Sequence, residues 1–200
     1  MKAVLASKNP HKLAEIQAIL SGLGVEVVME SELGLDIDVD ETGTTFEENS
    51  RLKAEAVMRA ANMPAIADDS GLMVDALDGA PGVYSARYGH KSSDGERTEF
   101  LLENMKGVPD DKRTAKFVCV ITCLWPDGRK IAARGECPGQ ILLAPQGQGG
   151  FGYDPVFYLP ELQKTYAELR PEEKNAISHR ARALQAFCRI YREEFEHDDK

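Results

Sequence analysis

Short apolar runs alternate with stretches of helical periodicity in the first part of the chain. Residues 3–6 and 25–29 are dominated by small and β-branched apolar side chains, which is typical of short buried strands. Between these runs the apolar side chains recur at steps of three and four residues, which places them on one face of a helix. They are Leu13, Ile16, Ile19 and Leu20. The pattern predicts a β-α-β unit, whose two strands pair in parallel.

A second helix and a third strand follow. Thr45-Phe-Glu-Glu48 forms a capping box, which predicts a helix from this point to about Asn62. Residues 65–67 are again small and apolar, and Asp68-Asp-Ser-Gly71 comes directly after them. A strand that ends in charged side chains and a glycine turn places those side chains at the edge of a sheet. The strand is expected to continue over residues 72–77.

The second half of the chain predicts a hairpin of two long strands. Residues 113–125 are rich in β-branched and aromatic side chains, and the turn signal Pro126-Asp-Gly-Arg129 follows. The partner strand is expected over residues 130–137, with an interruption at Pro138-Gly139 and an extension over residues 140–144.

Two further helices complete the pattern. Asp94 is expected to cap a helix that ends before Pro109, and Ser178 to cap a final helix whose apolar stripe runs from Ala181 to Phe195. All elements together predict an α/β fold, in which helices flank a twisted mixed β-sheet. We expect one domain over residues 1–200 with two lobes. The first lobe takes approximately residues 1–110 and 171–200, and the second approximately 111–170.

Composition excludes several classes of protein. The chain of 200 residues is 42% hydrophobic and 28% charged, which is typical of a globular domain. The formal net charge of -9 argues against binding to nucleic acid, because such binding depends on Lys and Arg neutralising phosphates. None of the four cysteines belongs to a Cys-x-x-Cys pair, so a structural zinc site is not expected. The lack of a signal peptide or a long apolar segment predicts a cytoplasmic protein without a membrane partner.

Two acidic stretches could bind a cation. Adjacent carboxylates such as Asp68 and Asp69 are unfavourable unless a cation or a proton lies between them, although the same residues also favour an ordinary turn. Asp40 and Glu41 could supply a further carboxylate to a metal ion. The alternation of Asp36, Asp38 and Asp40 could instead be the exposed face of an edge strand.

Three other stretches could bind an anionic or planar ligand. The turn Ser7-Lys-Asn-Pro-His-Lys12 precedes a helix, whose N-terminal N–H groups favour anions. Residues 147–155 combine four glycines with Phe151 and Tyr153, which could stack on a planar base. His179 and Arg180 lie in the first turn of the final helix, where basic residues oppose the helix dipole.

Taken in order, these stretches resemble the inosine/xanthosine triphosphate pyrophosphatase family, the Ham1-like nucleotidases. The matching segments span most of the chain. They are Ala6–Lys12, Glu41–Gly43, Ala67–Leu72, Gly79–Tyr88, Gly150–Pro155 and Glu173–Arg180. One departure is visible near the N-terminus, where the family usually has Thr-Gly-Asn and this chain has Ser7-Lys-Asn9. Lys8 therefore replaces a glycine of the family pattern.

The resemblance implies hydrolysis of the α–β phosphoanhydride of ITP, dITP and XTP to the monophosphate and pyrophosphate, with Mg²⁺ and a homodimer. It assigns Glu41 and Asp69 to the metal, with Asp40 as a possible substitute. Asp69, or Asp68 beside it, would act as the general base. The residues implied for substrate binding come from five stretches of the chain. They are Ser7, Lys8, Asn9, Pro10, His11, Lys12, Ser70, Phe151, Gly152, Tyr153, Asp154, Lys174, His179 and Arg180.

Two alternatives remain open at this stage. The chain could be a pyrophosphatase for another class of modified nucleotide, or a nucleotide-binding sensor without turnover. Acidic pairs argue against the sensor, because a simple binder gains nothing from negative charge beside phosphate. Hypoxanthine and xanthine present a 6-oxo acceptor, to which His179 and Arg180 could donate, whereas adenine presents a 6-amino donor.

Overall fold

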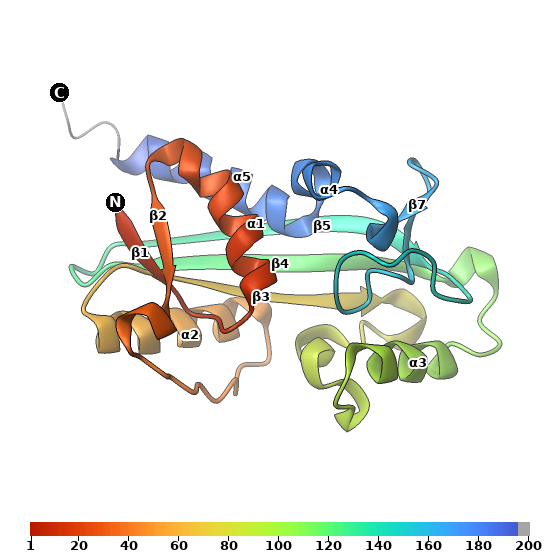
Figure 1. The fold of residues 1–200 in the computed structure, drawn as a ribbon. Helices are drawn as coiled ribbons and strands as arrows, with labels where there is room; N and C mark the ends of the chain where they lie inside the picture. The colour runs from red at the N-terminus through yellow and green to blue at the C-terminus, as the bar shows by residue number, and fades with distance from the viewer. Residues whose placement is uncertain (196–200) are drawn as a thin grey trace. The chain divides into compact units, whose positions relative to one another are not determined.

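A computed structural model describes residues 1–195 of the chain (Figure 1). The chain divides into two compact units. The first comprises Met1–Asp69, Cys119–Gly135 and the described part of His179–Lys200, and the second comprises Ser70–Val118 and Glu136–Ser178. These ranges differ from the lobe boundaries that the sequence pattern suggests. Each unit has a buried apolar core of its own.

Seven strands form one sheet in the order β2-β1-β3-β4-β5-β6-β7. β1 pairs in parallel with β2 and with β3, whereas β6 pairs antiparallel with β5 and with β7. The predicted mixed sheet and the parallel β-α-β start are therefore confirmed. The strands are β1 Lys2–Leu5, β2 Glu26–Met29, β3 Ala65–Val74, β4 Thr114–Leu124, β5 Lys130–Ile141, β6 Phe157–Leu159 and β7 Lys164–Thr165.

Local sequence signals define the helices of the first unit, which are α1 (Pro10–Leu20), α2 (Phe46–Ala61) and α5 (His179–Phe195). At the start of α1 the Asn9 side chain accepts a hydrogen bond from the backbone N–H of His11, and proline occupies the first helical position. The predicted capping box opens α2, and a left-handed residue ends it.

The alternation of side chains along β1 distributes them between two helix layers. Ala3 and Leu5 pack with apolar residues of α1 and α5, whereas Val4 and Ala6 pack with α2. Figure 1 shows α1 and α5 on one side of β1 and α2 on the other. The first unit is therefore a three-layered arrangement of helix, sheet and helix.

The second unit contains α3 (Asp94–Asn104) and α4 (Pro171–Ile177). Its core includes three aromatic rings from β4, β6 and the turn after β7. The rings of Phe117 and Phe157 meet edge to face with centroids 4.6 Å apart, and Tyr166 lies 4.8 Å from Phe157 and 5.5 Å from Phe117. Aromatic pairs at such distances stabilise a core beyond the area that they bury.

A buried guanidinium joins the end of α3 to the end of β5 in this unit. Arg113 donates from Nε to the carbonyl of Ile141, from Nη1 to that of Met105 and from Nη2 to that of Leu142. Burial lowers the pKa of Arg113. The three carbonyl groups supply the polar surroundings that a buried charge needs.

Three local predictions are wrong. β3 ends at Val74, and a 3₁₀ turn covers Asp75–Leu77, where a strand was expected. Ser93, not Asp94, caps α3, because the Ser93 hydroxyl accepts from the backbone N–H of Glu96.

The third error is the interruption expected at Pro138-Gly139, since β5 runs through both residues. Gly139 permits this because β6 lies very close to it. A Cβ atom at position 139 would lie 2.6 Å from Cζ of Phe157 and 2.7 Å from the carbonyl oxygen of Tyr158. Glycine is therefore required for close approach of the backbones and does not end the strand.

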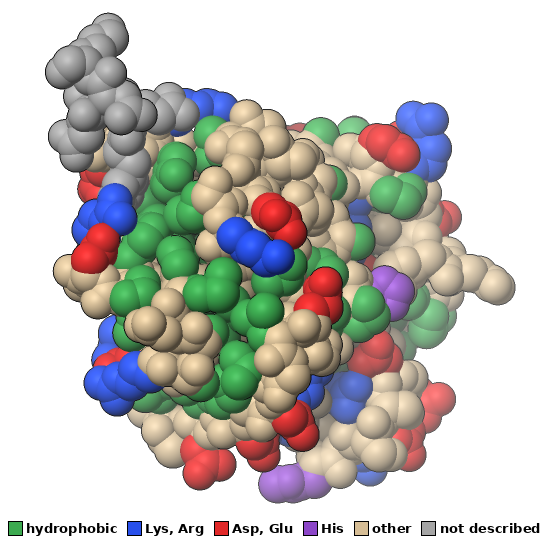
Figure 2. Space-filling view, turned by 60° about the vertical axis from the view of Figure 1, so that its left-hand side comes forward, with side chains coloured by type: hydrophobic (Ala, Val, Ile, Leu, Met, Phe, Trp, Pro, Cys, Tyr) green, Lys and Arg blue, Asp and Glu red, His purple; other side chains and the backbone are tan. Residues whose placement is uncertain are grey.

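The surface in Figure 2 carries Lys and Arg side chains interspersed with Asp and Glu, without an extended area of one sign. Within residues 1–195, every helix is too short or too polar to cross a membrane.

Candidate active site

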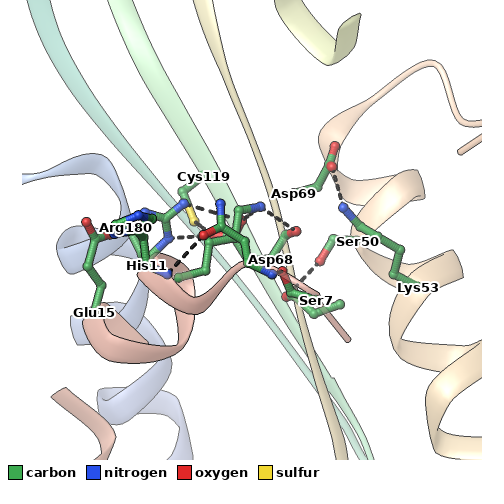
Figure 3. Close-up of polar contacts among 12 residues, drawn as sticks. Ser7, His11, Glu15, Ser50, Lys53, Asp68, Asp69, Cys119 and Arg180 are labelled. Atoms are coloured by element: carbon green, nitrogen blue, oxygen red, sulfur yellow. Dashed lines mark hydrogen bonds and ion pairs between the residues drawn. The ribbon is translucent and has the colours of Figure 1, made fainter. Parts of the chain in front are cut away.

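The alternation of side chains along β3 sends its two aspartates to opposite faces. Ile66 packs in the core formed with α1 and α5, whereas Ala65 and Ala67 pack in the core formed with α2. Successive side chains of a strand point to opposite faces of the sheet. Asp68 therefore lies on the same face as Ile66, and Asp69 lies on the same face as Ala67. Figure 3 shows the result, with Asp68 directed toward Arg180 and Asp69 toward Lys53 of α2.

Asp68 is buried among cationic partners. Its carboxylate accepts from Nε of Arg180 at 2.8 Å and pairs with Nζ of Lys12, and Sγ of Cys119 lies 3.0 Å from Oδ2. Burial opposes the charged form, but the charges of Arg180 and Lys12 outweigh burial and hold the pKa of Asp68 well below its usual range. Asp68 is therefore a permanent anion and a weak base.

Asp69 has a different environment, although it is the next residue. Oδ1 accepts from Nζ of Lys53 at 2.6 Å, while Oδ2 is buried and accepts no hydrogen bond from any described residue. Burial is the largest influence on the pKa of Asp69 and raises it above the ordinary value, although Lys53 acts in the opposite direction. A carboxyl group with an available oxygen and a raised pKa is suited to accept a proton.

Lys53 connects Asp69 to the acidic segment before α2. Its Nζ lies 2.8 Å from Oε1 of Glu41 as well as 2.6 Å from Oδ1 of Asp69. Burial lowers the pKa of Lys53, but the two carboxylates outweigh burial and raise it. The two predicted metal ligands therefore lie around one cationic group.

The donor set fits a magnesium ion. Mg²⁺ is usually held by one or two carboxylates together with waters and substrate phosphates, and Glu41 and Asp69 provide two carboxylates and one buried oxygen without a hydrogen bond. Among the residues that the structure describes, no group of three or more His, Cys, Asp or Glu side chains is arranged to hold a metal ion. A protein site made of two carboxylates leaves the other positions to water and substrate.

The predicted phosphate-binding turn is shaped by its own side chains. The Ser7 hydroxyl accepts from the backbone N–H of Asn9 at 3.2 Å, and Asn9 accepts from that of His11 at 2.9 Å. Pro10 and His11 form the first turn of α1, and Lys12 follows with its ammonium on Asp68. Lys8, the departure from the family pattern, is exposed and pairs with Asp36 at 2.6 Å.

In the second unit the glycine-rich segment is closed by Asp154. Oδ2 of Asp154 accepts from the backbone N–H of Phe151 at 2.9 Å and from Nζ of Lys174 at 2.8 Å. The same ammonium lies 4.8 Å from the centre of the Phe151 ring. The structure thus brings Phe151, Asp154 and Lys174 together, although Lys174 is 20 residues further along the chain.

Tyr153 differs from the expectation that it stacks on a base. Only 4% of its surface is exposed, and its ring belongs to the core of the second unit. Its hydroxyl donates to the carbonyl of Ser85 at 2.8 Å. Phe151, which is partly exposed, is the aromatic side chain of this segment that a ligand can reach.

The start of α5 also differs from expectation. Arg180 was expected to donate to a purine, but it is 1% exposed, and its Nε and Nη1 donate to Asp68 and Glu15. Its main contacts therefore position Asp68. His179 is buried at the first residue of α5, and Ser70, directly after Asp69, is partly exposed.

Sequence reasoning missed Lys53, Glu15 and Cys119, each of which contacts a predicted residue. Lys53 had a usable signal, since it lies three and four residues after the buried positions Ser50 and Asn49 of α2. A lysine beside the buried face of a helix suggests a buried anionic partner.

Residues 3–190 match the model of the Ham1 family. The dITP/XTP pyrophosphatase of Clostridium perfringens (strain 13 / Type A) is 50% identical, over 92% of this chain and 94% of the relative. The dITP/XTP pyrophosphatase of Escherichia coli (strain K12) is also 50% identical, over the same shares of the two chains.

Solved structures agree with these relatives. The Staphylococcus aureus Ham1 protein superimposes with a TM-score of 0.87 at 44% identity, covering 97% of this chain and 100% of that one. A HAM1 protein from Coxiella burnetii gives the same TM-score at 43% identity, covering 96% and 99% of the two chains. The likeness in sequence and in fold extends over nearly the whole length, and the chain belongs to the Ham1 family.

Proposed function

We propose that this chain hydrolyses non-standard purine nucleoside triphosphates, namely ITP, dITP and XTP, to the monophosphate and pyrophosphate, and so cleanses the nucleotide pool. The observation that carries the proposal is the environment of Asp69. Its carboxylate combines a buried oxygen without a hydrogen bond, a raised pKa and a lysine shared with Glu41. The printed names of the family relatives, dITP/XTP pyrophosphatase, support the choice of substrates.

Asp69 is the proposed general base. The proton of the attacking water goes to Oδ2 of Asp69, the water oxygen forms a new bond to phosphorus, and the α–β phosphoanhydride bond breaks to release pyrophosphate. Lys53 holds the other oxygen of the carboxylate and so orients Oδ2. Asp68 is not suited to this step, because its depressed pKa and its cationic partners keep it ionised.

Glu41 and Asp69 are the proposed ligands of Mg²⁺, with Asp40 as a possible substitute for Glu41. When bound, this ion would neutralise charge on the triphosphate, which otherwise repels the acidic residues. Lys53 is already cationic at this position, so it lowers the repulsion between the two carboxylates before any ion is present.

The triphosphate is proposed to bind at the turn of residues 7–12 and at Ser70 and Lys174. Backbone N–H groups at the start of α1 favour phosphate, and Ser7 and Asn9 hold the turn in its shape. Lys8 adds an exposed ammonium, which can exchange Asp36 for a phosphate oxygen at little energetic cost because exposed ion pairs are weak.

The purine is proposed to contact the segment Phe151–Asp154 and His179. Phe151 offers a ring for stacking, and donors directed at a 6-oxo group would be left unpaired by the 6-amino group of adenine. Arg180 is assigned here to the positioning of Asp68, in agreement with its contacts. The resemblance further supports a homodimer, which light scattering after gel filtration can test, and we propose a cytoplasmic location for it.

The proposed function is tested by measuring pyrophosphate release from ITP, dITP, XTP and dATP, with Mg²⁺ and with EDTA. We expect Mg²⁺-dependent release from the first three substrates and at least 100-fold lower kcat in D69N, since general-base catalysis contributes about 10²–10⁴-fold. D111N, at an exposed aspartate, is the matched control. Nucleotide binding without pyrophosphate release would indicate a nucleotide-binding sensor. Turnover of other modified nucleotides, but not of ITP, dITP or XTP, would indicate a pyrophosphatase for another class of nucleotide.

A further inference from the structure

Two side chains near the start of α3 hold the peptide groups on both sides of Gly152. Oδ2 of Asp94 accepts from the backbone N–H of Gly152 at 2.8 Å, and Oγ1 of Thr98 donates to its carbonyl oxygen at 3.4 Å. Asp94 and Thr98 are four residues apart in α3, so they lie on one face of the helix. The two side chains thus form a two-point clamp, the Asp94–Thr98 clamp, on one glycine.

Gly152 has few other restraints. Its φ of +61° lies in the left-handed region, and a Cβ atom built on it would meet no heavy atom within 4 Å. A cavity of about 330 Å³ is lined by Asp94, Thr98 and the glycine-rich segment, so packing does not hold the segment on that side. Because glycine is the most flexible residue, its two hydrogen bonds set the orientation of the adjoining peptide planes.

The clamp adds to other contacts of the segment. The backbone N–H of Gly149 donates to the carbonyl of Ala167 at 3.0 Å, and Nζ of Lys174 lies 4.8 Å from the centre of the Phe151 ring. Asp154 closes the turn by accepting from the backbone N–H of Phe151, and Tyr153 anchors the far side in the core. Phe151 lies between this closure and the clamped peptide of Gly152. The direction of the Phe151 ring therefore depends on the contacts of α3 with Gly152 as well as on Lys174.

We propose that Asp94 and Thr98 are positioning residues that set the Phe151 ring for the purine base and thereby determine affinity and base preference. This inference rests on the proposed function, in which Phe151–Asp154 contacts the base. Neither residue belongs to the motifs that suggested the activity. Their role follows from the hydrogen bonds to Gly152 and from the open space around it.

The test compares D94A and T98V with two conservative variants and a control. Asn in D94N keeps an oxygen acceptor for the Gly152 N–H, and Ser in T98S keeps the hydroxyl. E103A removes another carboxylate of α3, which is exposed and pairs only on the surface with Lys106. KM and kcat are measured for dITP and dATP, and the dissociation constant of dIMP is measured for the same proteins by calorimetry.

We expect D94A and T98V to raise KM for dITP and Kd for dIMP about fivefold or more, which corresponds to the loss of one ordinary hydrogen bond. The kcat should stay within about twofold, and the preference for dITP over dATP should fall. D94N, T98S and E103A should stay close to the wild type. A general loss of structure would instead lower kcat for both substrates. If D94A does not fold, T98V still tests the inference, because valine and threonine have nearly the same shape.

The inference would be overturned if KM for dITP and Kd for dIMP were unchanged in T98V and D94A. It would also be overturned if E103A raised these two constants as much as D94A and T98V do. If the wild type binds dIMP but releases no pyrophosphate from dITP, the proposed reaction fails, while the shift in Kd still decides the role of the clamp. If the wild type binds no dIMP, the base-binding role of the segment fails, and the inference fails with it.

Discussion

Replacing the adjacent aspartates one at a time by asparagine should affect stability differently, with a large loss in D68N and no loss in D69N. D68N and D69N make the same chemical change at consecutive residues of β3, and both side chains are buried. Asp68 pairs with Arg180 and Lys12, whereas Asp69 pairs with Lys53 alone among the ion pairs described, and Lys53 keeps Glu41 if Asp69 is neutral. The two substitutions therefore separate the two electrostatic environments.

D68N should be strongly destabilising. Removing one partner of a buried ion pair leaves an uncompensated charge and typically lowers the free energy of unfolding by about 3–5 kcal/mol. For a chain of this length each kcal/mol corresponds to about 2–4 °C, so Tm should fall by roughly 6–20 °C. Glu15 still pairs with Arg180 in this variant, which favours the lower part of the range.

D69N should leave stability at neutral pH unchanged or higher while it abolishes activity. The pKa of Asp69 is raised in the folded protein, so its charged form is less favourable there than in the unfolded chain. The neutral amide removes this penalty. The loss of activity then comes from the lost base and not from unfolding.

The pH dependence has opposite signs at the two positions. The pKa of Asp68 is lowered from 3.8, so its contribution to stability is present above about pH 4 and is lost as the pH falls through the lower folded value. The pKa of Asp69 is raised from 3.8, so the wild type approaches the stability of D69N as the pH falls toward 4.

Urea unfolding of both variants and the wild type, at pH 7 and at pH 4, measures these differences directly. Unchanged m-values would show that the same surface is exposed on unfolding. The reasoning is refuted if D69N loses as much stability as D68N at pH 7. It is also refuted if D68N is as stable as the wild type.

Three further substitutions test other contacts. R113M should lower the free energy of unfolding by about 3 kcal/mol or more in urea titration, because three buried carbonyls lose their donor. G135A should lower the free energy of unfolding by about 2 kcal/mol or more in thermal unfolding, because the added Cβ would lie 2.3 Å from the backbone of α5. G22A is its control and should not lower it, because a Cβ atom at position 22 meets no heavy atom within 4 Å. R180K should lower stability and kcat for ITP and dATP alike if Arg180 positions Asp68, since lysine lacks the planar fork from which separate nitrogens of Arg180 donate to Asp68 and to Glu15. A selective loss with ITP would return Arg180 to base recognition.

Much of the fold was predictable because its signals are local. The capping box at Thr45, the helical spacing in α1 and the apolar runs of β1 and β2 each depend on a few neighbouring residues. Errors arose where a distant element overrides a local signal. Gly139 predicts an interruption in isolation, but β6 needs the space that a side chain there would fill.

The candidate site was predictable as a set of residues and less so as a set of contacts. The motifs contain Asp69, Lys174 and Asp154, and spacing alone does not reveal that Lys174 binds Asp154 across 20 residues. Tyr153 illustrates the same limit, because an aromatic residue in a glycine-rich segment can face a ligand or the core with the same local sequence. Burial, which depends on the whole unit, decides between these outcomes.

The sequence suggested that the adjacent aspartates need a cation or a proton between them, but the structure gives each carboxylate a separate environment. Each carboxylate has its own partners, because the strand places them on opposite faces. The parallel pairing of Val4 with Ala65 and Leu5 with Ile66 holds β3 in register. A shift of one residue would exchange the two faces and place Asp69 between Lys12 and Arg180, where its pKa would be depressed. The division of roles between a permanent anion and a proton acceptor therefore depends on strand register, which the apolar cores on both faces of the sheet fix together.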